Sequence, residues 1–183
     1  MKFEVHTLQS APEQSRPLLE GAKKKFGFIP NLQAVFATSP AAIEAYGAIA
    51  KALDNAALDP VEQQVVFLTV SAKNGCEYCV AAHSMLATMA SMPEQVLQAL
   101  RNGEAIEDPK LKALSDFTAA VRDHQGWVPD AALKAFAEAG YNERHVLDVI
   151  TILAMKTLSN YTNHIADTPL DDAFADHAWK GPR

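Results

Sequence analysis

The spacing of apolar side chains and turn residues predicts a chain built from helices. The clearest case begins at Asp59, which can cap a helix, with Pro60 at the first helical position and Glu62 completing a capping box. Apolar residues then form one broad face, and Asn74-Gly75 is typical of a helix end with a left-handed residue. We therefore predict a helix over about 60–74.

Similar start and stop signals recur along the chain. Asp108-Pro109 and Asn142-Glu143 are good helix starts, and Gly103, Gly126 and Gly140 are good stops. They predict further helices near residues 12–25, 39–53, 76–90, 93–102, 109–123, 129–139 and 143–166. No segment alternates apolar and polar residues with the period of two that half-buried strands show. We therefore expect an all-α fold of about seven or eight helices.

The length and apolar content of the chain favour a single domain. It has 183 residues, and apolar types make up 49% of them. That is enough for one full core and too little for two comfortable domains. We expect one helical domain over residues 1–183, in which the segment 27–31 is a packed, ordered connection.

The charge and hydropathy of the sequence exclude several partner classes. The net charge is −6, and the longest basic run is Lys23-Lys24-Lys25, so we expect no nucleic-acid partner. No stretch approaches the roughly 18 apolar residues of a membrane span. The N-terminal residues MKFEVHTLQSAPEQ lack the apolar segment of a secretory signal. We therefore expect a soluble protein of the reducing cytoplasm.

The candidate chemistry lies in the stretch from Gly75 to His83. Cys76 and Cys79 are the only cysteines of the chain, and the loop between them is too small to stabilise a fold. In a reducing compartment such a pair is typical of catalysis or metal binding. On a helix the two thiols share a face, and His83 lies one turn beyond Cys79 on that face.

This arrangement suits thiol redox chemistry. A free cysteine with a pKa near 8.5 is only a few per cent thiolate at neutral pH, and a neighbouring histidine can take its proton. The helix N-terminus favours the anion, above all at Cys76. A thiolate can attack the O–O bond of a peroxide, and the second cysteine then condenses with the sulfenic acid to a disulfide. A dithiol donor resets the pair by exchange.

Two other interpretations of the cysteines stay open at this point. Cys76, Cys79 and His83 could bind zinc with His164 or His145 as a fourth ligand, although cysteines three apart on a continuing helix suit zinc poorly. The two thiols could also be small apolar core side chains, but that explains neither Gly75 nor the in-register His83.

The stretch LDPVEQQVVFLTVSAKNGCEYCVAAH at 58–83 resembles the alkyl hydroperoxidase D / carboxymuconolactone decarboxylase superfamily. The segments GFIPNLQAVFATSPAAIEAY and NYTNHIAD resemble its peroxidase-related branch. The likeness covers a core of about 27–167 and leaves a C-terminal tail at about 168–183. Decarboxylase members act on a lactone without a cysteine pair, so the pair argues against that chemistry here.

The resemblance implies an all-helical fold that assembles into trimers or hexamers. It also implies a two-cysteine peroxidase that needs no metal or organic cofactor. In the hydroperoxidase members a Glu twelve residues before the first cysteine completes a proton relay with the histidine. Gln64 stands at that position here, and it can orient His83 by a hydrogen bond but cannot accept a proton. Tyr78 is a second supporting candidate, at the entrance to the cysteine site or in the core.

The leading hypothesis is therefore an enzyme that reduces alkyl hydroperoxides with a dithiol or protein reductant. We expect Cys79, deprotonated with help from His83, to attack the peroxide and Cys76 to resolve the sulfenic acid. The reverse assignment stays open, because Cys76 lies nearer the helix N-terminus and is expected to be more exposed. The alternatives are a general thiol-disulfide oxidoreductase or redox sensor, and a helical oligomeric scaffold without turnover.

Overall fold

The computed structural model describes residues 2–181, which form nine α-helices and three short 3-10 helices and contain no strand. The all-α prediction is confirmed. The α-helices are α1 (Arg16–Phe26), α2 (Asn31–Phe36), α3 (Pro40–Ala52), α4 (Pro60–Lys73), α5 (Glu77–Met89), α6 (Glu94–Asn102), α7 (Pro109–Asp123), α8 (Asp130–Glu138) and α9 (Glu143–Ala166). The 3-10 helices are η1 (Glu13–Ser15), η2 (Leu53–Asn55) and η3 (Asp172–His177).

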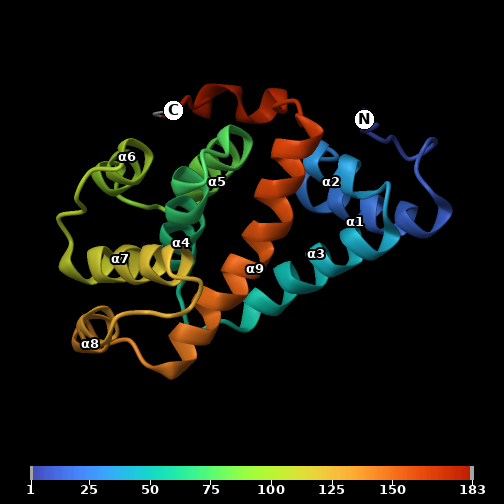
Figure 1. The fold of residues 1–183 in the computed structure, drawn as a ribbon. Helices are drawn as coiled ribbons and strands as arrows, with labels where there is room; N and C mark the ends of the chain where they lie inside the picture. Colours follow the sequence, from blue (N-terminus) through green and yellow to red (C-terminus); the bar gives the residue numbers. More distant parts are fainter. Residues whose placement is uncertain (1, 182–183) are drawn as a thin grey trace.

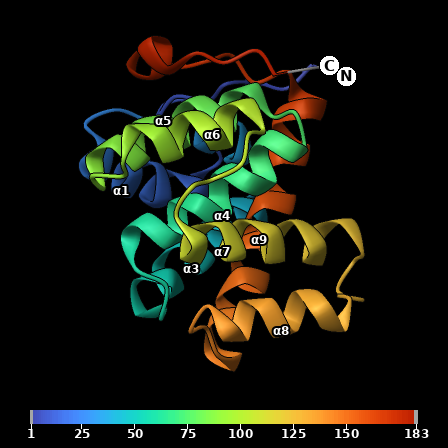
Figure 2. The same cartoon turned by 90° about the vertical axis from the view of Figure 1, so that its left-hand side faces the viewer.

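Helices α4 and α9 organise the fold (Figure 1). Helix α4 packs against α5, α7 and α9, and α9 also packs against α2 and α3. Figure 1 shows α9 crossing the middle of the molecule, with α1–α3 on one side and α4–α8 on the other. Figure 2 shows α7 and α8 running side by side at the end of the molecule away from α5. The cysteine region at the start of α5 packs against side chains of α1–α3 and against the C-terminal half of α9.

The local signals that predicted the helices are visible as hydrogen bonds. The Glu62 N–H donates to Asp59 Oδ1 at 2.8 Å, and the Asp59 N–H donates to Glu62 Oε2 at 3.0 Å, which is the predicted capping box. Gly75 ends α4 with a φ of 65°, in the left-handed region that glycine occupies without strain. That turn brings the chain directly into α5.

One helix was not predicted. Residues 27–31 were expected to form a packed connection, and α2 begins at the end of that segment and continues to Phe36. It is only six residues long, and four of its residues, Leu32, Ala34, Val35 and Phe36, are buried. So short a helix has little intrinsic stability, because nucleation is costly and packing must supply the rest.

The segment after α9 is ordered where it is described. Residues 172–177 form η3, which packs against α5, and the red ribbon lies over α5 and α6 in Figures 1 and 2. Arg101 donates to the carbonyls of His177 and Ala178, and Trp179 Nε1 donates to the carbonyl of Arg101. Of the predicted tail at 168–183, residues 182 and 183 lie outside the described part, as does residue 1 of the predicted domain.

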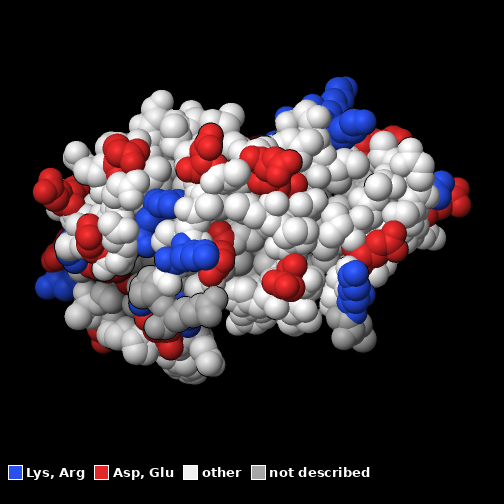
Figure 3. All heavy atoms as spheres, turned by 90° about the horizontal axis from the view of Figure 1, so that it is seen from above, with Lys and Arg blue, Asp and Glu red and all other residues white. Residues whose placement is uncertain are grey.

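Buried apolar side chains form two adjoining clusters. The larger is centred on α4, α6, α7 and the middle of α9. The smaller joins α1–α3 to the start of α5 and to η3, and it contains both cysteines. Within residues 2–181, no helix is long and apolar enough to cross a membrane. Charged side chains of both signs are interspersed on the face that Figure 3 shows.

Candidate active site

The two cysteines meet at the N-terminus of α5. Cys76 is the N-cap residue, with an extended backbone, and Cys79 lies in the first turn of the helix. Both are free thiols, and their side chains are buried, with exposed fractions of 1% and 2%. The prediction that Cys76 is the more exposed thiol is therefore wrong, because Asn163 of α9 and residues 167–168 cover it.

Helix α9 supplies a polar stripe that faces the thiols. Asn163 Nδ2 donates to Cys79 Sγ at 3.2 Å and lies 3.7 Å from Cys76 Sγ. Lys156 and Ser159, seven and four positions earlier on the same side of α9, are also buried. All three were missed by sequence reasoning, although polar residues at this spacing inside a buried helical face were a usable signal.

The pair ionises asymmetrically. Burial raises the pKa of the Cys79 thiol, but hydrogen bonds from Cys76, Lys156 and Ser159 and the positive charge of Lys156 lower it well below the ordinary value. The hydrogen bond to Cys79 and burial raise the pKa of Cys76. The sulfur that carries the negative charge is thus Cys79. The expectation that the helix N-terminus favours the anion above all at Cys76 is wrong, because side-chain partners outweigh it.

His83 lies one turn beyond Cys79 and is buried. Its Nδ1 is 2.9 Å from Gln64 Oε1, so the expected hydrogen bond between these two residues is present. With Oε1 accepting, Nδ1 carries the proton and Nε2 is free to accept one. The ring stacks on Phe67 with centroids 4.3 Å apart. Burial, and then the charge of Lys156, lowers the pKa of His83 well below its ordinary value, so the imidazole is neutral.

The Tyr78 side chain lies in the protein interior that encloses the cysteine site and not at the protein surface. Its hydroxyl donates to Asp171 Oδ2 at 2.5 Å and accepts from the Leu32 N–H at 3.3 Å. Asp171 also accepts from the Asn31 N–H at 3.1 Å. Burial and the Asp171 carboxylate raise the pKa of Tyr78, which keeps the phenol protonated. Tyr78 therefore ties the start of α5 to α2 and to the C-terminal segment.

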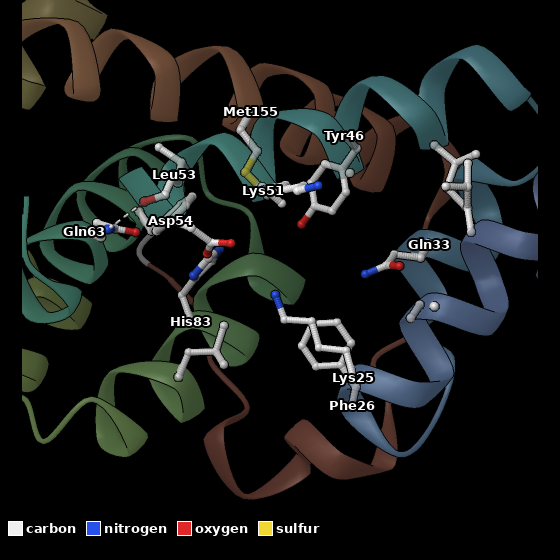
Figure 4. Close-up of a pocket in the computed structure, with 18 of the residues that line it drawn as sticks. Lys25, Phe26, Gln33, Tyr46, Lys51, Leu53, Asp54, Gln63, His83 and Met155 are labelled. Carbon is white, nitrogen blue, oxygen red and sulfur yellow. Dashed lines mark hydrogen bonds between the residues drawn. The ribbon is translucent and has the colours of Figure 1, made fainter. Parts of the chain in front are cut away.

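Two neighbouring spaces lie beside the cysteine site, and Figure 4 shows the larger one. A small cavity of about 70 Å³ is lined by Cys79, His83 and Lys156. A larger pocket of about 590 Å³ shares His83 and Tyr46 with it and opens between α1, α3, α4 and α5. In Figure 4 the Tyr46 hydroxyl and the Lys25 amine point into this pocket. The remaining lining is largely apolar, including Leu18, Ala22, Phe26, Ile43, Phe67, Leu86 and Met155.

Cys76 faces a different opening. A cleft of about 350 Å³ lies between the start of α5 and the end of α9, and it is lined by Cys76, Glu77, Asn163, His164 and Asp167. His164, one of the two histidines considered as a fourth zinc ligand, lies on this cleft. His145, the other, caps α9 by accepting from the Asn142 N–H at 3.1 Å. In the described range, no three His, Cys, Asp or Glu side chains are grouped as a metal site requires.

Residues 37–108 match the family model of the carboxymuconolactone decarboxylase family. The whole fold matches a peroxidase-related protein from Ralstonia eutropha JMP134, described as an alkylhydroperoxidase AhpD core. The TM-score is 0.84 at 27% sequence identity, and the match covers 94% of this chain and 93% of that one. The family-model match and the fold match both support the likeness of this chain to the carboxymuconolactone decarboxylase superfamily. The resemblance drawn from the motif at 58–83 is thus confirmed.

Two further solved structures share the fold. A peroxidase-related protein from Silicibacter sp. TM1040 matches with a TM-score of 0.81 at 19% identity, over 95% of this chain and 92% of that chain. A cysteine-to-alanine variant of the debrominase Bmp8, in complex with 2,3,4-tribromopyrrole, matches with a TM-score of 0.75 at 20% identity, over 94% and 96%. At these identities the likeness concerns the fold alone. No curated protein matches the chain.

Proposed function

We propose that this protein is a thiol-dependent peroxidase that reduces organic hydroperoxides through Cys79 and Cys76. The observation that carries the proposal is the position of Cys79. This thiol, whose pKa is lowered, lines a small cavity with a neutral histidine, next to a largely apolar pocket of about 590 Å³. A peroxidase needs a thiolate, a group that moves protons and room for the organic part of its substrate.

The chemistry balances with these groups and an external dithiol. The Cys79 thiolate attacks the terminal oxygen of ROOH, an S–O bond forms, the O–O bond breaks, and the alkoxide leaves as ROH after taking a proton. The Cys76 thiol attacks the sulfenic sulfur, the S–O bond breaks, and water leaves with the thiol proton. His83 Nε2, which is unprotonated while Nδ1 donates to Gln64, accepts and returns protons in these steps.

A dithiol reductant completes the cycle by exchange. We propose that it attacks Cys76 Sγ through the cleft of about 350 Å³ at the start of α5, and that it is oxidised to its own disulfide. The burial of both sulfurs favours a small dithiol, or a thiol carried on a slender arm, over a folded protein disulfide. This argues against action on protein disulfides, which is one form of the general thiol-disulfide oxidoreductase considered from the sequence; action on a small dithiol stays an alternative.

We further propose that the chain works as a homo-oligomer. One side of α9 is exposed and carries no charge over five turns: Leu147, Ile150, Ala154, Thr157, Tyr161 and Ile165. Their spacing of three or four residues places them on one stripe, opposite Lys156 and Asn163. An uncharged stripe of this length is typical of a helix that packs against another subunit.

The test of the proposed function is a stopped-flow reaction of the fully reduced protein with cumene hydroperoxide and with hydrogen peroxide, followed by a count of free thiols. We expect two thiols lost per chain, faster with cumene hydroperoxide. Cys79→Ser should abolish the first step, and Cys76→Ser should stop the reaction at the sulfenic acid. Thiols that resist both peroxides but exchange with small disulfides would contradict the peroxidase and favour the oxidoreductase.

A further inference from the structure

Lys156 is a buried cation for which the cysteine chemistry above has no explicit role. Its side chain is 1% exposed and lines the small cavity with Cys79 and His83. Its Nζ lies 5.5 Å from the centroid of the Phe67 ring, the same ring that stacks on His83. Across the described part of the chain, no carboxylate lies within 4 Å of this ammonium group.

A buried ammonium is costly unless an anion compensates its charge. The ring of Phe67 offers a weak cation–π contact only. The one neighbour that can become an anion at neutral pH and that lines the same cavity is the Cys79 thiol. Hydrogen bonding and charge therefore both favour an ion pair between the Lys156 ammonium and the Cys79 thiolate. Each ion lowers the free-energy cost of burying the other.

We propose that Lys156 is the resident counter-ion of the Cys79 thiolate and thereby determines which of the two cysteines attacks. The reactive state is an ammonium–thiolate pair between α9 and α5, with His83 neutral beside it. Lys156 lines the same small cavity as the reacting sulfur, so we place this residue in the catalytic machinery. The part played in peroxide attack rests on the proposed function, whereas the ion pair itself does not depend on it.

The other titratable groups around the thiols do not compete for this role. Tyr46 from α3 and Tyr78 from α5 have pKa values raised by burial first, so both phenols stay neutral. The Asp171 carboxylate accepts a hydrogen bond from the Tyr78 hydroxyl. His83 carries no charge, because burial disfavours the imidazolium and the charge of Lys156 lowers its pKa further. His83 moves protons, whereas Lys156 compensates the negative charge of the thiolate.

The ion pair also affects the disulfide. When Cys79 is in a disulfide it carries no charge, and Lys156 loses its partner, so the oxidised state is disfavoured relative to the reduced state. The disulfide is then more oxidising than an unassisted pair would be. When a reductant attacks Cys76 Sγ, a new S–S bond forms there, the Cys76–Cys79 bond breaks, and Cys79 leaves as the thiolate that Lys156 pairs with. A leaving thiol with a lower pKa leaves faster.

The test uses the full chain and readouts that need no peroxide. In a Cys76→Ser background, the rate of iodoacetamide alkylation of Cys79 is measured against pH, together with thiolate absorbance near 240 nm. We expect Lys156→Met, which is uncharged and of similar length, to reduce alkylation at about pH 7 by at least about tenfold. We expect Lys134→Met, which removes an exposed lysine of α8, to leave the profile unchanged.

A second pair of measurements separates Lys156 from His83 and guards against misfolding of the first variant. His83→Gln should leave the thiolate in place at neutral pH. In the two-cysteine protein, Lys156→Met should make the disulfide about tenfold harder to reduce by dithiothreitol, a shift of about 30 mV to lower potential. Loss of the thiolate in His83→Gln, or an unchanged profile in folded Lys156→Met, would overturn the proposal. A protein that keeps the ion pair but ignores peroxide would contradict only the proposed function.

Discussion

Asn163 donates a hydrogen bond to Cys79 Sγ at 3.2 Å, although the two residues are 84 positions apart in the chain. Its carbonyl oxygen Oδ1 is buried and has no hydrogen-bond partner among the described residues. The amide is therefore oriented by the sulfurs, with its donor end toward them. A group held in this way favours the charged form of Cys79, because a hydrogen bond to an anion is stronger than one to a neutral thiol.

This orientation predicts the effect of Asn163→Asp. The substitution keeps the shape of the side chain but replaces the donor with a carboxylate, which repels the thiolate and raises the pKa of Cys79. At pH values below the pKa of Cys79, alkylation should slow by about tenfold for each unit by which that pKa rises. Asn163→Ala is the matched control, because it removes the donor without adding a charge, and its effect should be smaller. Equal effects of the two variants would contradict the argument.

The hydrogen bond between Gln64 and His83 predicts the result of Gln64→Glu. A carboxylate at this position would accept from Nδ1 and raise the pKa of His83. Because only neutral His83 can accept a proton, the acid limb of the peroxide-reaction profile should move to higher pH. Above that limb the reaction should be faster, because the imidazole is a stronger base.

The measurement for Gln64→Glu is the stopped-flow rate with cumene hydroperoxide from about pH 5 to about pH 9. Gln64→Ala serves as the control, since it leaves Nδ1 without the acceptor that fixes the tautomer. It should slow the reaction without moving the acid limb upward. An acid limb that stays in place in Gln64→Glu would show that His83 does not titrate in this range.

The lowered pKa of Cys79 predicts the pH dependence of the unmodified protein. Since the pKa of Cys79 lies well below its ordinary value, alkylation of Cys79 should already be near its maximum at that ordinary value and should fall only as pH drops through the lowered pKa. A cysteine with an ordinary pKa would instead gain reactivity up to and through about pH 8.5. The check is the single-thiol alkylation rate of the Cys76→Ser variant, with free glutathione followed in parallel.

The contact between Tyr78 and Asp171 predicts that the C-terminal segment protects the site. Asp171→Asn should weaken the bonds from Tyr78 and from the Asn31 N–H, at a cost of about 1.5–3 kcal/mol in the free energy of unfolding, as for other bonds to charged groups. The thiols should also react faster with a bulky maleimide, because η3 forms part of their cover. Urea unfolding and maleimide kinetics measure both effects. Asp172→Asn, one residue further on and exposed, is the matched control and should change neither.

The uncharged stripe on α9 predicts a subunit interface. Ile165→Glu, which places a charge on a side chain that is 71% exposed, should shift the chain toward monomers in light scattering after size exclusion. The fold should be retained, because the stripe does not contribute to the core. Lys134→Glu introduces the same new charge on α8 and should leave the assembly unchanged. A chain that is monomeric without any substitution would contradict the interface.

The helices could be predicted because their signals are local. Caps such as Asp59, and glycine stops such as Gly75, act within a few residues, so most helix limits agree within two or three positions. Helix α2 was missed because its stability depends on burial against other elements. The cysteine pair and His83 were found for the same local reason, since they lie within one turn or two of each other.

The α9 side of the site could not be assigned from the sequence. Lys156 and Asn163 reach the thiols only because α9 crosses α5 at a particular register, and nothing local to either helix fixes that register. Asp171 also reaches the site only through the packing of a distant segment. Its hydrogen bond with Tyr78 helps to enclose the site. Burial by these distant segments is also why Cys76 is covered, when its position at a helix start indicated an exposed thiol.

The two openings described above lie on either side of one pair of sulfurs. Cys79 lines the small cavity next to the large pocket, and Cys76 faces the cleft between α5 and the end of α9. Oxidant and reductant therefore need not wait for one another to vacate a shared binding space, and the kinetics should be ping-pong without substrate inhibition by excess dithiol. A small molecule fitted to the large pocket would block oxidation yet leave the cleft at Cys76 free for the dithiol, so each half of the catalytic cycle can be inhibited and followed separately.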